Sequence, residues 1–179
     1  MLIFVPLTAA ELTDWAQTGS HRPSDAHAVT ASLRAAFGFT PADDEDAEHT
    51  VLHIAGLVAL LRGGRRLVAV AGASATPAAG SEFGQVHAGV LPWSAVTALF
   101  DDDEPDAASA LLAGLGPVGL ETAWDDPRVA DFLAEQELSW HGPGEWTALT
   151  QSRLLTPARR VKHGSHSTVA PGHLPRECG

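Results

Sequence analysis

A run of regularly spaced apolar residues between Asp43 and Gly64 restricts the fold more than any other part of the sequence. Its apolar positions recur at intervals of four and three residues and share one face of a helix: Ala47, Val51, Ile54, Val58 and Leu61. Acidic residues at the start and Arg62 at the end suit the helix macrodipole, and two glycines end the helix. The segment 67–71 follows without polar alternation, which indicates a strand buried on both faces. A helix with one apolar face, followed by such a strand, predicts an α/β arrangement.

Shorter signals predict the remaining elements. Thr8 and Glu11 have the spacing of a capping box, which predicts a helix to about residue 17. Strands are expected at 2–6, 26–29, 83–90, 96–100 and 138–141, helices at 105–112 and from Pro127 onwards, and irregular chain at 114–124. The sequence therefore predicts a single α/β domain over residues 1–150, with α+β as the alternative. Its sheet is expected to be mixed or partly antiparallel, with about four to five short strands and helices packed on it.

Charge divides the chain into two parts. Residues 1–150 contain six arginines and 21 acidic residues, whereas residues 151–179 contain five basic residues and one acidic residue. The acidic body repels nucleic acid and anionic membranes, so neither is expected as a partner. Its acidity has two interpretations: it keeps the protein soluble, or it attracts a basic protein partner. Residues 151–179 lack apolar periodicity and are expected to form a disordered basic tail.

Three residues of the long helix are weak candidates for a metal site. Glu45, His49 and His53 follow one another at intervals of four and therefore share a helical face. Two imidazoles one turn apart can bind a transition ion, and a carboxylate one turn earlier could join them. However, this face lies opposite the apolar one, so we expect it to face solvent, where a two-histidine site is weak. The HExxH pattern is also absent. The sequence predicts no functional metal and no cofactor.

Two charged clusters also carry chemistry-bearing side chains. The acidic run Asp101–Glu104 follows a predicted strand, where carboxylates can hold Mg²⁺ or Ca²⁺, but its spacing is not that of an EF-hand. We expect it to be a solvated loop. Arg62, Arg65 and Arg66 follow the long helix, and no glycine-rich phosphate loop precedes that helix. They are therefore expected to act as charges at the helix C-terminus.

The segment Trp140–Trp146 is the preferred candidate for a functional surface. Two tryptophans flank a Gly-Pro-Gly turn, with His141 and Glu145 between them. His141 and Glu145 could form an acid–base pair, and the indole rings could form a ligand platform or a protein-binding patch. The interpretation we favour is that both Trp140 and Trp146 pack on the core and close the domain, and the segment remains the preferred place to look for an exposed functional surface.

Several short motifs resemble one protein family. These are residues 3–6, 11–12 and 26–30 with 33–34, the acidic run into Glu48, and residues 68–70. Together they cover about residues 1–75, with weaker similarity to about residue 137. Here the chain resembles an uncharacterised actinobacterial family, a domain of unknown function found in short, acidic, cytosolic proteins. The resemblance implies a cytosolic setting and carries no mechanism.

The sequence favours a binding role over catalysis. Signatures of serine hydrolases, dinucleotide-binding domains and P-loop proteins are absent. The single cysteine, Cys178, cannot form an internal disulfide, which favours a cytoplasmic location. No apolar run is long enough to cross a membrane. We therefore expect a non-enzymatic cytoplasmic interaction or regulatory module. The alternative is a small hydrolase or metal-dependent enzyme that uses His141 and Glu145, or His49 and His53.

Overall fold

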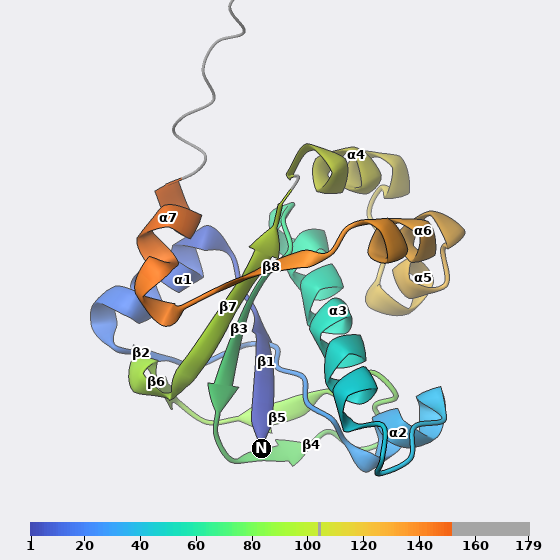
Figure 1. Cartoon of the computed structure of the whole chain (residues 1–179), viewed down its shortest axis with the longest axis horizontal. Coiled ribbons are helices and arrows are strands. Elements are labelled where there is room, and N and C mark those ends of the chain that lie inside the picture. The colour runs from blue at the N-terminus through green and yellow to red at the C-terminus, as the bar shows by residue number, and fades with distance from the viewer. Residues whose placement is uncertain (104, 152–179) are drawn as a thin grey trace, which may run out of the picture.

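The computed structural model describes residues 1–103 and 105–151. Within them, a four-stranded sheet in the order β1-β3-β7-β8 forms the centre of the molecule (Figure 1). The elements are β1 (Leu2–Pro6), α1 (Ala9–Thr18), β2 (Ser20–His21), α2 (Ala31–Phe37), α3 (Asp44–Gly63), β3 (Leu67–Gly72), β4 (Ala75–Pro77), β5 (Val86–Ala88), β6 (Leu91–Pro92), β7 (Val96–Asp102), α4 (Pro105–Leu115), α5 (Leu120–Trp124), α6 (Pro127–Glu135), β8 (Leu138–His141) and α7 (Trp146–Gln151). Of the predicted tail at 151–179, only Gln151 falls inside the described residues, as the last residue of α7.

The sheet confirms the predicted single α/β domain and its buried strand. β3 lies between β1 and β7, and its first five residues are all buried. The strands pair antiparallel throughout, where the sequence left room for a mixed sheet. The reason lies in the connection between β1 and β3. The chain passes through three helices and enters β3 beside the end of β1, so that Pro6 pairs with Val68 and Leu2 with Gly72.

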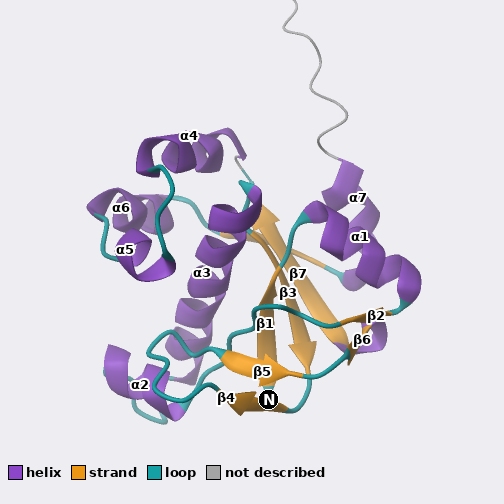
Figure 2. Ribbon diagram, turned by 180° about the vertical axis from the view of Figure 1, so that it is seen from behind, coloured by secondary structure: helices purple, strands orange, loops and turns teal. Residues whose placement is uncertain are grey.

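Helices cover both faces of the sheet (Figure 2). On one face, α1 and α7 pack over a core that contains Trp15 and Leu149. On the other face, α3 packs over β1 and β3 through a cluster that contains Ile54. A third cluster joins α3, through Leu57 and Leu60, to the small helices α4, α5 and α6 beside it. α3 is therefore buried on two sides, towards the sheet and towards the small helices.

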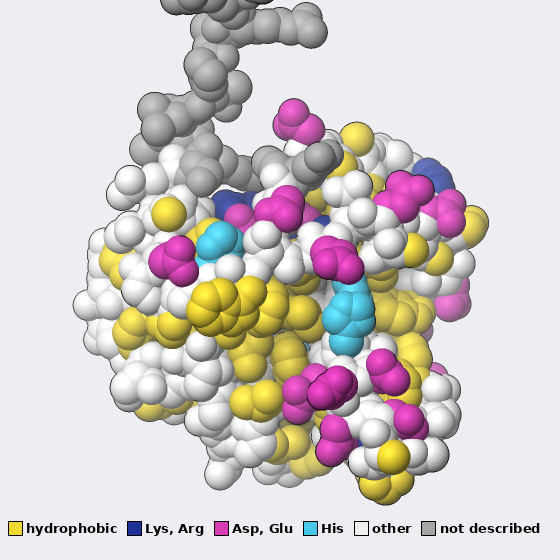
Figure 3. Space-filling view, in the orientation of Figure 1, with side chains coloured by type: hydrophobic (Ala, Val, Ile, Leu, Met, Phe, Trp, Pro, Cys, Tyr) yellow, Lys and Arg dark blue, Asp and Glu magenta, His cyan; other side chains and the backbone are white. Residues whose placement is uncertain are grey.

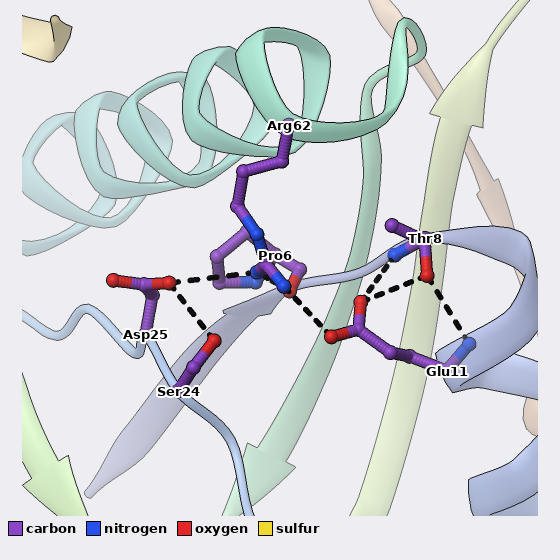
Figure 4. A network of polar contacts seen from close by, with 6 residues as sticks. All are labelled: Pro6, Thr8, Glu11, Ser24, Asp25 and Arg62. Atoms are coloured by element: carbon purple, nitrogen blue, oxygen red, sulfur yellow. Dashed lines mark hydrogen bonds and ion pairs between the residues drawn. The ribbon is translucent and has the colours of Figure 1, made fainter.

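A network of polar contacts around Arg62 joins the start of α1 to the end of α3 (Figure 4). Thr8 and Glu11 form the predicted capping box, in which Glu11 N–H donates to Thr8 Oγ1 at 3.2 Å and Thr8 N–H donates to Glu11 Oε2 at 2.7 Å. Arg62 donates to Glu11 Oε1 at 2.7 Å and to the Pro6 carbonyl at 3.2 Å, and it pairs with Asp25 at 3.5 Å. Burial raises the pKa of Glu11. The hydrogen bonds from Thr8 and the charge of Arg62 outweigh this effect and hold the pKa of Glu11 below its usual value. Arg62 is thus a cross-link between helices and not only a helix-terminal charge.

Three local predictions differ from the structure. The strand expected at 83–90 is confined to β5, and the one expected at 26–29 is reduced to His27, which makes isolated bridges to Phe4 and Gln85. The segment 114–124, expected to be irregular, contains α5. In each case the segment is short, and its conformation is set by the neighbours it packs against. Among the described residues, no helix combines the length and the apolar character needed to cross a bilayer.

Candidate functional site

The face of the sheet that α3 covers extends past the helix onto β7 and β8. Phe100 and Trp140 are cross-strand partners, and Leu138 lies two residues before Trp140, so the three side chains point to the same face. Phe100 and Leu138 pack partly buried against the α3 cluster, whereas Trp140 is 63% exposed. We call these three residues the β8 face. Figure 3 shows hydrophobic side chains across this side of the molecule, with histidine and acidic side chains around them.

The structure does not place all four residues of the predicted Trp140–Trp146 surface on one side of the sheet. Trp140 and His141 are neighbours on β8 and therefore point to opposite faces of the sheet. Trp146 begins α7 and packs against the core on the α1 side, so the expectation that both tryptophans close the core is wrong for Trp140 only. A Cβ added at Gly142 would lie 3.9 Å from Trp140 Cη2 and 3.5 Å from Glu145 Oε2. Trp140 and Glu145 are thus brought together beside this glycine.

Glu145 caps the turn that follows β8. Its Oε2 accepts the Gly142 N–H at 2.6 Å, which fixes the carboxylate against the backbone. Among the hydrogen bonds described for residues 105–151, none joins Glu145 to His141. The two residues of the predicted acid–base pair are therefore not joined by a hydrogen bond among the described residues.

His49 and His53 form a close pair on α3. Their Nε2 atoms lie 3.1 Å apart, and the two rings are nearly perpendicular. The expectation that this face meets solvent is correct for His49 and wrong for His53, which is only 8% exposed. Burial, followed by the charges of His49 and Arg66, lowers the pKa of His53 to about 4. Glu45 does not complete a three-residue metal-binding group with the two histidines in the part of the chain that is described.

The acidic run, expected to be a solvated loop, and the arginines, expected to act as charges at the helix C-terminus, form two ion pairs with little solvent exposure. Asp101 pairs with Arg65, and Asp102 pairs with Arg66, whose side chain is 1% exposed. Arg66 N–H also donates to Asp102 Oδ2 at 2.7 Å, and its guanidinium donates to the Gln136 carbonyl at 2.9 Å. The antiparallel register explains the pairing, since it sets the start of β3 against the end of β7. The predictions of a solvated loop and of simple helix-terminal charges are therefore wrong for these four residues.

Comparison with protein families matches residues 1–150 to a family of unknown function, DUF6912. The chain belongs to this family. The match covers both the predicted domain and the segments that carry the β8 face and the histidine pair. Neither the curated proteins nor the solved structures yielded a match to the chain. Because DUF6912 has no assigned activity, any function for the chain must be argued from its geometry.

One further hollow in this DUF6912 chain lies away from every residue singled out in the sequence. It measures about 860 Å³ and lies between the loop 78–85 and the segment 119–125. Glu82, Glu121 and Asp125 line it, and all three side chains are exposed. The hollow is thus an acidic, solvated depression. Sequence reasoning missed it because its two walls lie about 40 residues apart in the chain.

Proposed function

We propose that this DUF6912 chain is a non-enzymatic binding module that takes a basic protein partner on the β8 face, with Trp140 as the central contact. The observation that carries the proposal is the exposure of this one indole on an edge strand. Tryptophan is the side chain most enriched in the hot spots of protein interfaces. We also place the module in the cytoplasm, because its single cysteine allows no internal disulfide.

Trp140 contributes little to the core of its own domain. Trp15 is fully buried, and Trp93, Trp124 and Trp146 are partly buried against core clusters. Transfer of a large apolar side chain from water into a well-packed contact is worth about 1.5–3 kcal/mol. Because the Trp140 side chain is mostly exposed, most of this free energy is not gained when the domain folds. It can be gained when a partner buries the ring.

The position of β8 makes the ring accessible from two directions. Among the described strands, β8 pairs with β7 alone, so no strand covers its outer side. Exposed sheet edges of this kind are common docking places for other chains. A partner can therefore contact Trp140 from the face of the sheet, beside Phe100 and Leu138, or from its edge.

Charge supports a basic partner. Five of the six arginines in residues 1–150 pair with carboxylates of the same chain: Arg34, Arg62, Arg65, Arg66 and Arg128. The excess acidic side chains consequently lie at the surface. Figure 3 shows several of them around the hydrophobic side chains on this side of the molecule. Lysine or arginine side chains on a partner would complement them, and such contacts weaken as salt is added.

The hydrolase alternative has no comparable support. It requires His141 and Glu145 to exchange a proton, yet no hydrogen bond joins them among the described residues and the Glu145 carboxylate accepts the Gly142 N–H. The metal-dependent alternative concerns the histidine pair His49 and His53 on α3.

The test compares two variants that each remove an exposed apolar side chain. Trp140→Ala alters the β8 face, and Val90→Ala, whose side chain is 55% exposed between β5 and β6, is the matched control. Wild type and variants are used to capture proteins from a lysate of the source organism, at low and high salt. The captured protein is then purified and its affinity measured by calorimetry.

The expected result is a basic protein held by wild type and by Val90→Ala, released at high salt and lost with Trp140→Ala. The loss in affinity should be about 30-fold or more, since a hot-spot truncation costs about 2 kcal/mol or more. If Trp140→Ala binds as wild type does, or if wild type captures no basic protein, the proposal is wrong.

A further inference from the structure

The histidine pair on α3 lies on one helical face, as the sequence predicts, but it is less exposed than expected because His53 is buried. His49 and His53 lie one helical turn apart, and both rings turn their Nε2 atoms towards each other, to a separation of 3.1 Å. We propose that these two Nε2 atoms bind one divalent first-row transition ion, with Cu²⁺ bound most tightly. This site is independent of the proposed protein partner.

The separation of the two nitrogens suits one ion between them. Bonds from imidazole nitrogen to such an ion are about 2.0–2.1 Å long. With bonds of this length, two ligand nitrogens lie about 2.9 Å apart when the nitrogen–metal–nitrogen angle is a right angle, and about 3.4 Å apart when it is tetrahedral. The observed 3.1 Å lies between these values. The pair therefore fits either geometry with shifts of a few tenths of an ångström.

The surroundings hold the ligands in the form that binds metal. Neutral imidazole is the ligating form. His53 is only 8% exposed, and burial disfavours the charged form of an imidazole, so this ring is favoured as the neutral ligand. Arg66 is the cation that acts on His53, but its guanidinium is paired with Asp102. The first turn of α3 is acidic, which favours the approach of a cation.

The ion would keep open coordination positions. Among the described residues, no third histidine, cysteine, aspartate or glutamate completes a group around the pair. Water or an outside donor would take the remaining positions. Imidazole ligands select zinc, nickel and copper over magnesium and calcium, and copper(II) ranks first among the divalent ions.

The test is a Cu²⁺ titration of the full chain, followed by calorimetry and by electron paramagnetic resonance. Every protein carries Cys178→Ser, which removes the only thiol. His49→Ala is the main variant because His49 is exposed, so its replacement leaves the core intact. His87→Ala removes another exposed histidine, from β5, as the matched control. The histidines beyond residue 151 are unchanged in all variants and contribute equally.

The expected result is one equivalent of Cu²⁺ that His87→Ala retains and that His49→Ala loses or binds more than tenfold more weakly. Changes to groups that only support a ligand already cost about 10–100-fold in affinity. The spectrum of the wild-type equivalent should show hyperfine coupling to two nitrogens, and that of His49→Ala should not. Equal stoichiometry and affinity in wild type and His49→Ala would show that the rings only hydrogen-bond to each other, and would overturn the proposal.

Discussion

The buried pair of Arg66 and Asp102 allows the sharpest prediction of stability, for the variant Asp102→Asn. Each carboxylate oxygen accepts a different donor of Arg66: Oδ1 accepts Nε–H at 2.5 Å, and Oδ2 accepts the backbone N–H at 2.7 Å. An asparagine amide has one acceptor and one donor end. It can serve only one of the two N–H groups, and its own NH₂ must face the other.

The expected cost follows from what remains buried. In Asp102→Asn, the guanidinium of Arg66 keeps its bond to the Gln136 carbonyl and its place over the ring of Phe132, 4.4 Å from the centroid, but it loses its counter-charge. Removal of one partner from a buried ion pair costs about 3–5 kcal/mol. This is a large part of the roughly 5–15 kcal/mol that stabilises a typical domain.

A double variant separates the charge from the packing. Arg66→Met combined with Asp102→Leu removes both charges, and replacement of a whole buried pair is often neutral. However, the backbone N–H of Arg66 then lacks its acceptor, which costs about 1–3 kcal/mol. The double variant should therefore be more stable than Asp102→Asn and less stable than wild type.

The assay is equilibrium unfolding in urea at pH 7, followed by tryptophan fluorescence, with Asp126→Asn as the control. Asp126 pairs with Arg128 at the surface and caps α6, and asparagine is also a good cap. This control should lose much less stability than Asp102→Asn, because ion pairs at the surface contribute little. If Asp102→Asn loses no more than Asp126→Asn, the argument from buried charge is refuted.

Two further predictions concern acid stability and backbone geometry. Burial holds the pKa of His27 below 6.5, against the opposing effects of the Phe83 carbonyl and a nearby carboxylate. The unfolded chain therefore binds the extra proton first, and stability should fall as pH drops from about 6.5 towards the lowered pKa. The test variant is His27→Asn, whose side chain can still donate a hydrogen bond to the Phe83 carbonyl. Its plot of unfolding free energy against pH should be less steep than that of wild type by up to about 1.4 kcal/mol per pH unit. An unchanged slope would contradict the assignment of this effect to His27. Gly84→Ala should cost more than about 2 kcal/mol, because φ is +66° and the new Cβ would lie 2.4 Å from the Ala28 carbonyl oxygen. Gly19→Ala, at φ +79° in open space, should cost only about 1 kcal/mol, and equal urea midpoints for the two would contradict the clash.

The parts of the fold that the sequence predicts correctly depend on short-range signals. The capping box of Thr8 and Glu11, the helix α3 and the buried strand β3 are all encoded within a few neighbouring residues. The ion pairs of Arg65 and Arg66 depend instead on the register of β3 against β7, which joins residues 36 positions apart. Neither cluster alone shows that the other will face it, so the acidic run was interpreted as a solvated loop and the arginines as charges at the helix C-terminus.

The exposure expected for His53 was wrong for a different reason, and here the sequence did contain a usable signal. One apolar stripe on α3 was taken as its whole buried surface, yet Leu52, Leu57 and Leu60 lie outside that stripe and are all buried. Apolar residues beyond one stripe mean that a helix has neighbours on more than one side. For α3 these are the sheet and the small helices. On this helix His53 is buried, whereas His49 is exposed. A polar residue on a helix with neighbours on two sides should therefore be expected to be buried, as His53 is, and not assigned to solvent because it lies opposite one apolar stripe.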